Sequence, residues 1–231
     1  MARLGIIAGL RSEALLLSAT ETGNNHVVLV AGADPDRARV LAEQAVSRGA
    51  EGLVSFGLAG GVDPSLSCGD VLVPETVVFG GESWPTDDRW RQRLDALLSG
   101  EFRVLKGLLA GSACVLSSPA HKVRLHEATA ASAVDMESHM VAGVAARHGI
   151  PFVVLRVVAD PAAQEVPPWL LRGIGTDGQV KPVAVIGGLL SQPSVLPKLI
   201  RLAGYNRRSL SVLRRVALLV GPDFAFGEFG G

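Results

Sequence analysis

The stretch PFVVLRVVAD, residues 151–160, decides the fold class. Residues 152–158 are almost all apolar and mostly β-branched, which favours a strand that is buried on both faces of a sheet. Gly149 precedes the stretch and closes a helical pattern over residues 137–148. The stretch ends on Asp160, a carboxylate at the exit of a buried strand. This combination predicts a parallel sheet covered by helices, with a polar site beyond the strand end.

The same alternation of strands and helices runs through the rest of the chain. Apolar runs at residues 4–9 and 27–30 indicate strands, and Asp34-Pro35 begins a helix that stops at Gly49. The pattern predicts an α/β fold, a three-layer αβα sandwich with a mixed, mostly parallel central sheet. Other elements are expected as strands at 52–56, 69–74, within 104–115 and at 133–136, and as a helix from Ser118-Pro119.

Length and composition fit one domain. The chain has 231 residues, of which 48% are hydrophobic and 19% charged, so a core covered on both faces is expected. No repeat or low-complexity linker divides it, which predicts a single domain over residues 1–231 with a helical C-terminal region at about 181–220. The 22 basic and 22 acidic residues give no electrostatic footprint for a nucleic acid, so a small molecule is the expected partner.

The sequence also bears on location. No apolar stretch reaches the roughly 18 residues that cross a bilayer. The two cysteines, Cys68 and Cys114, follow no signal-peptide pattern, which favours a reducing compartment, the cytoplasm. The region 181–219 is both apolar and basic. Its arginine spacing favours a packed amphipathic helix with a solvated face, and peripheral contact with a membrane surface is the alternative.

Three carboxylates follow predicted strands. Glu13 comes after the first strand, Glu137 after the strand that ends at Met136, and Asp160 after the strand at 152–158. Strand ends of a parallel sheet meet at one edge, so we expect these side chains to gather there. The glycine-rich run at 57–61 adds backbone amides that can approach a ligand closely.

Four segments of the chain resemble the phosphorylase superfamily, which includes purine nucleoside phosphorylases and methylthioadenosine/S-adenosylhomocysteine nucleosidases. Their order and spacing match as well, over roughly residues 1–165. The resemblance implies a phosphorylase/hydrolase-like αβα fold and cleavage of the N-glycosidic bond of a purine nucleoside. The four segments are residues 5–13, 56–62, 133–138 and 151–160.

Within that superfamily the chain looks closest to the hopanoid-associated phosphorylases, which are thought to remove adenine from adenosylhopane. The runs VDMESH at 134–139 and DPA at 160–162 carry this narrower resemblance, together with the basic, apolar C-terminal region. A methylthioadenosine/S-adenosylhomocysteine nucleosidase is the alternative enzyme. A non-catalytic protein that binds a nucleoside is the alternative from another class.

The resemblance implies a role for each residue around the scissile bond. Asp160 would be the general acid that protonates adenine, and burial would raise its pKa. Arg156, four residues earlier on the same strand, would orient that acid. Glu137 would accept hydrogen bonds from the ribose hydroxyls, and Met136 would pack against the ribose. The structural alternatives are a buried ion pair for Asp160, a helix-terminal carboxylate for Glu137 and a core residue for Met136.

The nucleophile is water or phosphate. Glu13 matches the nucleosidase glutamate that activates water, whereas Arg11 with backbone amides would hold a phosphate. Ser55 and Leu58 stand where bacterial purine nucleoside phosphorylases have a phosphate-binding arginine and serine, which speaks against phosphorolysis. A surface pair on a first helical turn is the structural alternative for Arg11 and Glu13. The residues expected around the nucleophile are Arg11, Glu13, Gly9, Ala59 and Gly60.

For the base, the resemblance places Val115 at an adenine-contacting position and Cys114 where nucleosidases have an aromatic residue. Trp84 and Phe79 are candidates to close the pocket instead, and Trp84 fits a surface-loop anchor or an interface residue equally well. The histidines lack the pairing of zinc ligands, so no metal is predicted. The glycine run fits neither the Walker nor the dinucleotide pattern, so no cofactor is expected beyond phosphate as a co-substrate. A homo-oligomer is expected by resemblance alone.

Overall fold

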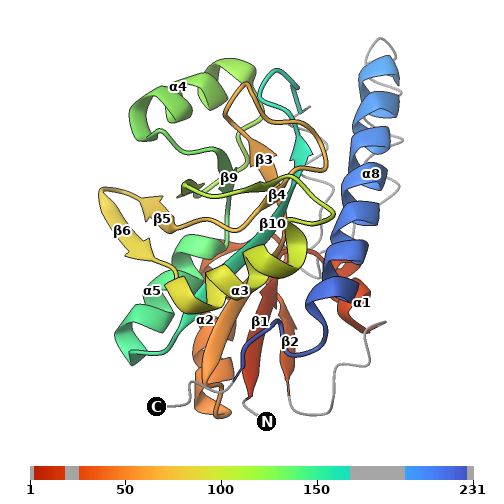
Figure 1. The fold of residues 1–231 in the computed structure, drawn as a ribbon. Coiled ribbons are helices and arrows are strands. Elements are labelled where there is room, and N and C mark those ends of the chain that lie inside the picture. Colours follow the sequence, from red (N-terminus) through yellow and green to blue (C-terminus); the bar gives the residue numbers. More distant parts are fainter. Residues whose placement is uncertain (1–2, 19–25, 167–195, 228–231) are drawn as a thin grey trace.

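The computed structural model describes residues 3–18, 26–166 and 196–227, and a ten-stranded sheet lies at its centre (Figure 1). Most strand pairs are parallel, and helices cover both faces of the sheet. The predicted three-layer αβα architecture is therefore confirmed. The single-domain organisation of residues 1–231 stays a prediction.

The strands and helices agree closely with the periodicity of the sequence. The strands are β1 (Leu4–Ala8), β2 (Val27–Val30), β3 (Gly52–Gly61), β4 (Val71–Leu72), β5 (Thr76–Phe79), β6 (Glu82–Pro85), β7 (Val104–Leu105), β8 (Leu108–Gly111), β9 (Ala133–Asp135) and β10 (Phe152–Asp160). The helices are α1 (Arg11–Ser18), α2 (Pro35–Ser47), α3 (Asp88–Leu98), α4 (Pro119–Thr129), α5 (Ser138–His148) and α8 (Leu196–Val220).

The sheet branches at β3. One edge of β3 pairs with β10, and the other edge changes partner along its length. On that second edge, β1 pairs with β3 as far as Ala8 opposite Phe56, and β9 takes over at Val134 opposite Gly60. Residues 57–59 lie between these two pairings, so strands β1 and β9 leave a gap in the sheet beside them.

The strand expected at 52–56 is longer in the structure than predicted and includes the glycine-rich run. Residues 57–61 continue β3, because β10 pairs with them on the other edge. Similarly, Asp160 is the last residue of β10 rather than a residue after the strand.

Two apolar clusters hold the layers together. The helices α2 and α5 pack on one face of the sheet, where alanines of α2 and valines of α5 meet β1, β3 and β10. The helices α1, α3 and α8 cover the other face. There Trp90 of α3 is fully buried, and its indole Nε1 donates a hydrogen bond to the carbonyl of Phe224 at 2.6 Å. A third, smaller cluster lies beneath α4.

Helix boundaries follow the predicted capping residues. Asp34 accepts a hydrogen bond from the amide of Arg37 at the start of α2, and Ser118 does the same for His121 at the start of α4. Gly149 ends α5 with a left-handed backbone (φ 64°), which glycine adopts at little cost.

The hairpin β5–β6 was not predicted, and the surface-loop alternative for Trp84 is wrong. Gly80 and Gly81 form its turn with positive φ angles of 59° and 86°. Trp84 lies on β6 and packs against the core cluster that includes α5. Phe79 of β5 stacks on His139, with 4.2 Å between the ring centroids. These aromatic residues therefore cover α5.

The C-terminal region predicted at about 181–220 is described only from residue 196 onward, as α8. Its residues 181–195 lie outside the described residues. Searching the described helices finds none with the length and apolar character that a membrane crossing requires.

Candidate active site at the gap in the sheet

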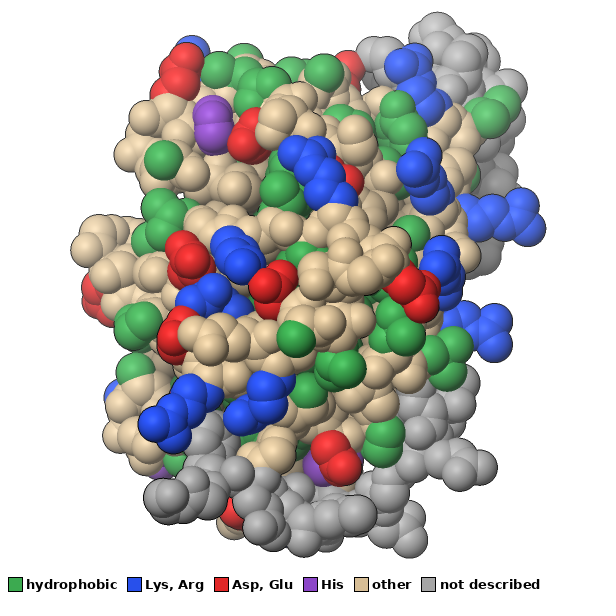
Figure 2. Space-filling view, in the orientation of Figure 1, with side chains coloured by type: hydrophobic (Ala, Val, Ile, Leu, Met, Phe, Trp, Pro, Cys, Tyr) green, Lys and Arg blue, Asp and Glu red, His purple; other side chains and the backbone are tan. Residues whose placement is uncertain are grey.

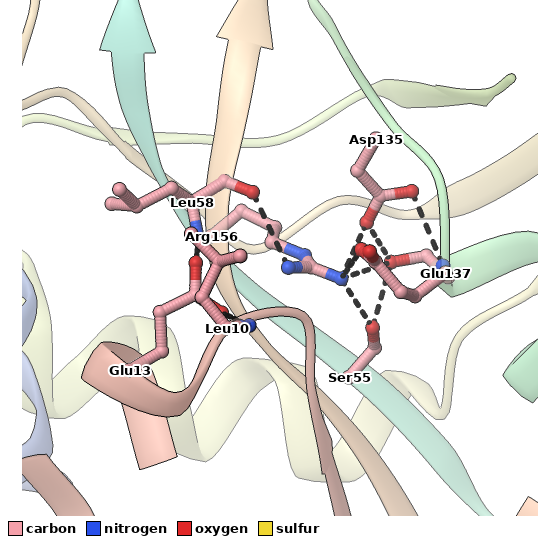
Figure 3. A network of polar contacts seen from close by, with 8 residues as sticks. Leu10, Glu13, Ser55, Leu58, Asp135, Glu137 and Arg156 are labelled. Carbon is pink, nitrogen blue, oxygen red and sulfur yellow. Dashed lines mark hydrogen bonds and ion pairs between the residues drawn. The ribbon is translucent and has the colours of Figure 1, made fainter. Parts of the chain in front are cut away.

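A buried arginine organises the gap beside β3. Arg156 projects from β10 and is 1% exposed. Its Nη2 lies 2.7 Å from Oδ2 of Asp135 and 3.1 Å from Oε2 of Glu137, and it donates a hydrogen bond to Oγ of Ser55 at 2.8 Å (Figure 3). The strands β10, β9 and β3 thus each contribute to one polar network. Its members are far apart in sequence.

Glu13 lies on the other side of this guanidinium. It belongs to the first turn of α1 and is 2% exposed. Its two carboxylate oxygens accept hydrogen bonds from the backbone amides of Leu10 (2.8 Å) and Leu58 (2.9 Å) (Figure 3). Leu58 is one of the β3 residues in the gap, so its amide is available to a side chain. The Glu13 carboxylate thus accepts the hydrogen bond that a neighbouring strand would otherwise accept from the Leu58 amide.

Two glycines make room for these carboxylates. A Cβ on Gly57 would lie 2.5 Å from Oε2 of Glu13 and 2.7 Å from Nη1 of Arg156. A Cβ on Gly9 would lie 3.0 Å from Oε1 of Glu137 and 3.3 Å from Oε2 of Glu13. A side chain at position 9 would therefore crowd both carboxylates, and a side chain at position 57 would displace the network.

Burial sets the protonation of the network. It raises the pKa of Glu137 to about 7, against the lowering effect of Arg156, and the nearby carboxylates of Asp135 and Glu13 raise it too. Burial also raises the pKa of Glu13, although Arg156 and the backbone amide donors oppose this. The Arg156 guanidinium thus stabilises the charged forms of three carboxyl groups, those of Asp135, Glu137 and Glu13.

Asp135 and Ser138 are members of the network that the sequence reasoning did not assign. Asp135 is buried at the end of β9, and its carboxylate accepts hydrogen bonds from the amide and the hydroxyl of Ser138. Both residues fall within the quoted run at 133–138. The signal available was the spacing of Asp135 and Glu137, two carboxylates beside a strand end.

Asp160 is held by a lysine and not by Arg156. Nζ of Lys122, on α4, donates to Oδ2 of Asp160, and no contact joins Asp160 to Arg156 among the described hydrogen bonds and ion pairs. The expectation that Arg156 orients Asp160 is therefore wrong. Positions i and i+4 share a face only on a regular strand, and β10 has a register irregularity between Val158 and Asp160. The buried ion pair considered for Asp160 exists, with a different partner.

Burial raises the pKa of Asp160, and the Lys122 ammonium beside it opposes this rise. The carboxylate lies over β3, where both of its oxygens are 3.7 Å from the position that a Cβ on Gly60 would occupy. Gly60 pairs with Asp160 on one side and with Val134 of β9 on the other. Asp160 therefore lies just beyond the gap, at the point where β9 begins to pair with β3.

The remaining predicted residues differ in how close they lie to the network. Met136 precedes Glu137 and is half-buried, and Ala59 is a buried residue of β3. Val115 is half-buried in the segment between β8 and α4, and Cys114 beside it is exposed. Arg11 is exposed on the first turn of α1, outside the network.

In the described parts of the chain, no three His, Cys, Asp or Glu side chains form a group that could hold a metal ion.

A comparison with protein families matches the phosphorylase superfamily over residues 12–172, more than half of the chain. The chain belongs to the phosphorylase superfamily. The superfamily predicted from four sequence segments is thus confirmed, and membership supports the prediction that the chain is an enzyme acting on nucleosides.

Solved structures share the superfamily fold. A 5′-methylthioadenosine/S-adenosylhomocysteine nucleosidase from Neisseria meningitidis, in complex with methylthio-immucillin-A, has a TM-score of 0.69 and 16% identity, covering 94% of this chain and 98% of its own. Futalosine hydrolase from Helicobacter pylori has a TM-score of 0.67 and 15% identity, covering 93% and 97%. A mutant methylthioadenosine/S-adenosylhomocysteine nucleosidase from Helicobacter pylori holds 5′-methylthioadenosine in its active site, with a TM-score of 0.66, 16% identity and coverage of 94% and 98%. At this identity the likeness concerns the fold.

Proposed function

We propose that this member of the phosphorylase superfamily cleaves the N-glycosidic bond of a purine nucleoside and releases adenine from an adenosyl compound. The observation that carries the proposal is the arrangement of carboxyl groups beside β3 and β10, with Glu13 and Glu137 around Arg156 and with Asp160 at the end of β10. Asp160 lies four residues beyond Arg156 on β10, and Arg156 contacts Glu137. The base is proposed to lie at Asp160 and the sugar at Glu137.

Asp160 is the proposed general acid. As the C1′–N9 bond breaks, the electron pair moves onto the base, and N7 takes the proton of the Asp160 carboxyl group. Burial raises the pKa of Asp160, although Lys122 opposes this, and a raised pKa is the direction that favours a carboxyl group acting as a proton donor. Val115 is proposed to contact the base.

Glu137 is proposed to bind the ribose hydroxyls, with Met136 packed against the sugar. Oε2 of Glu137 faces Arg156, and Oε1 faces Gly9, where the lack of a side chain leaves space. Charge that develops on the ribose ring as the base departs is stabilised by this carboxyl group.

The charge around Glu13 supports water as the nucleophile. The carboxyl groups of Asp135, Glu137 and Glu13 surround the buried guanidinium of Arg156, which is already paired with the first two. An incoming phosphate dianion would therefore be repelled by the ionised carboxylates without gaining Arg156 as a partner. Arg11, the other cation proposed for phosphate, is exposed. We therefore propose that Glu13 takes a proton from a water molecule that attacks C1′. Phosphate held by Arg11 and the amides around Gly9, Ala59 and Gly60 is the alternative.

The experiment that tests the function offers the protein adenosine, 5′-methylthioadenosine and S-adenosylhomocysteine, each with and without phosphate. Chromatography and mass spectrometry of the products then identify adenine and the sugar. Free ribose sugar in both conditions supports hydrolysis, and a sugar 1-phosphate formed only with phosphate would assign phosphorolysis. If no adenine appears from any adenosyl compound, while Asp160→Asn binds adenine normally, the chain is a nucleoside-binding protein without turnover.

The finer substrate proposal is adenosylhopane, whose 5′ substituent is long and apolar. The helix α8 supports it, because Arg201, Arg207 and Arg208 of α8 are exposed, as is the apolar Ile200, at 66%. Figure 2 shows Lys and Arg side chains along the edge that α8 forms. Peripheral contact with an anionic membrane, proposed for this helix, would bring such a substrate to the enzyme. Co-sedimentation with vesicles of phosphatidylglycerol and phosphatidylcholine, compared with phosphatidylcholine alone, tests the contact.

A methylthioadenosine/S-adenosylhomocysteine nucleosidase is the alternative assignment, and the fold shared with the Neisseria and Helicobacter nucleosidases is consistent with it. Competition between adenosylhopane and 5′-methylthioadenosine in one reaction decides between them. We also propose a homo-oligomer, which light scattering tests, and a cytoplasmic location, which the unpaired Cys68 and Cys114 support.

A further inference from the structure

Lys122 is a buried ammonium group that the proposed reaction has not yet used. It sits on the first turns of α4 and is 1% exposed. Besides Oδ2 of Asp160, its Nζ donates to the backbone carbonyls of Pro161 at 3.1 Å and Gln164 at 3.3 Å. A buried ammonium without acceptors would be costly, and these three acceptors satisfy its three hydrogens.

This lysine controls the electrostatics of Asp160. Lys122 is the charged group that acts on the Asp160 carboxyl within the described residues. Gly60 of β3, which carries no side chain, lies beneath the carboxyl group, and the carbonyls of Pro161 and Gln164 that share the Lys122 ammonium are uncharged. Arg156, four residues earlier on β10, is paired with the carboxylates of Asp135 and Glu137 instead.

We propose that Lys122 is a positioning residue for the general acid, which it holds through Oδ2 and whose conjugate base it stabilises. The inference rests on the proposed function. With Oδ2 bound to Lys122, Oδ1 is left to meet the base. When the proton passes to N7, negative charge develops on the Asp160 carboxylate, and the fixed ammonium stabilises that charge without moving. After adenine leaves, Asp160 takes a new proton from water, and Lys122 keeps its own protons throughout.

The direction in which the pKa of Asp160 changes when Lys122 is replaced follows from two opposing influences. Burial raises its pKa and Lys122 lowers it, so removing the lysine charge raises the pKa further. An opposite charge in direct contact typically lowers a carboxyl pKa by about 1–3 units. Activity that needs protonated Asp160 would then persist to higher pH, and kcat would fall because a weaker acid transfers its proton less readily.

The test compares the pH profiles of kcat for wild type, Lys122→Gln and Lys122→Arg. Glutamine keeps a hydrogen-bond donor for the two carbonyls but removes the charge, whereas arginine keeps the charge. We expect Lys122→Gln to lower kcat about 10- to 100-fold and to move the alkaline limb up by about one unit or more, with KM nearly unchanged. Lys122→Arg should leave the alkaline limb of the kcat profile at the wild-type pH, because the positive charge is kept. Lys106→Gln removes a surface charge that pairs with Asp95 at 2.9 Å, and it should behave as wild type.

A double-mutant cycle with Asp160→Asn separates this role from a merely structural one. If Lys122 acts through Asp160, Lys122→Gln should reduce kcat no further in the Asp160→Asn background. An unchanged alkaline limb in Lys122→Gln, or losses that multiply in the double variant, would overturn the inference. If Lys122→Gln does not fold, Lys122→Met replaces it in the test. The inference is also overturned if Lys122→Arg moves the alkaline limb of the kcat profile as far as the uncharged variant does. Failure of wild type to release adenine refutes the proposed function itself and is seen before any variant is made.

Discussion

Replacing Arg156 with methionine should strongly destabilise the protein. Methionine approximates the length of the side chain but leaves Asp135 and Glu137 without the cation that lies 2.7 and 3.1 Å from them. All three side chains are at most 6% exposed, so water cannot replace the guanidinium. Removing one partner of a buried ion pair typically costs about 3–5 kcal/mol. In a chain of this size that corresponds to a fall in Tm of about 6–20 °C.

The loss should depend on pH in a direction set by Glu137. Its pKa is raised on folding from the ordinary 4.5 to about 7, so the carboxyl group costs stability once the pH exceeds its unfolded pKa. Without Arg156 the folded pKa rises further, and the penalty extends to higher pH. Below pH 4.5 the group is protonated in both states and the penalty disappears. We therefore expect Arg156→Met to lose more stability at pH 8 than at pH 5.

Thermal and urea unfolding followed by circular dichroism at both pH values measure this difference. Arg215→Met is the matched control, because Arg215 pairs with Glu101 at 2.6 Å while both side chains are exposed by at least 45%. A pair of that kind contributes at most about 1 kcal/mol. If Arg156→Met and Arg215→Met lose the same stability, or if the loss for Arg156→Met is equal at pH 5 and pH 8, the account of a buried charge network is refuted.

Three further outcomes are expected. Gly57→Ala should lower both Tm and kcat, because the new Cβ would lie 2.5 Å from Oε2 of Glu13. Gly100→Ala is the control and should leave both unchanged, because a Cβ there would have no atom within 4 Å. Melting curves and the rate of adenine release measure these effects. Glu13→Gln should lower kcat about 10²- to 10⁴-fold with a smaller change in KM, as steady-state kinetics would show, because an amide cannot take a proton from water. Trp90→Phe should cost about 1–3 kcal/mol in urea unfolding, because the Phe224 carbonyl loses its buried donor; an unchanged midpoint would contradict that role.

Much of the fold could be predicted from local patterns. The strand at residues 27–30, the capped starts of α2 and α4, and the Gly149 terminus of α5 all lie where the sequence placed them. Each depends on neighbours in the chain, namely a run of apolar residues, a capping oxygen or a left-handed glycine. The hairpin β5–β6 escaped prediction because its strands are short and its polar residues are exposed.

Some members of the site were predictable from the sequence, but Asp135, Ser138 and Lys122 were not, and neither was the pairing of the side chains. Glu13, Glu137 and Arg156 were chosen and do meet, since strand ends of a parallel sheet converge. Their partners depend on features that no local pattern reports. The irregularity before Asp160 separates it from Arg156, and the fold of α4 brings Lys122 from 38 residues away. Lys122 has nothing in its immediate sequence that marks it.

The branching of the sheet at β3 has a consequence for refolding. The gap exists only when β1, β9 and β10 have all docked on β3, and these strands come from distant parts of the chain. Pairings of such long sequence separation are slow to form. Recovery of enzymatic turnover after dilution from denaturant should therefore lag behind recovery of helical signal, which makes turnover a sensitive reporter of complete assembly.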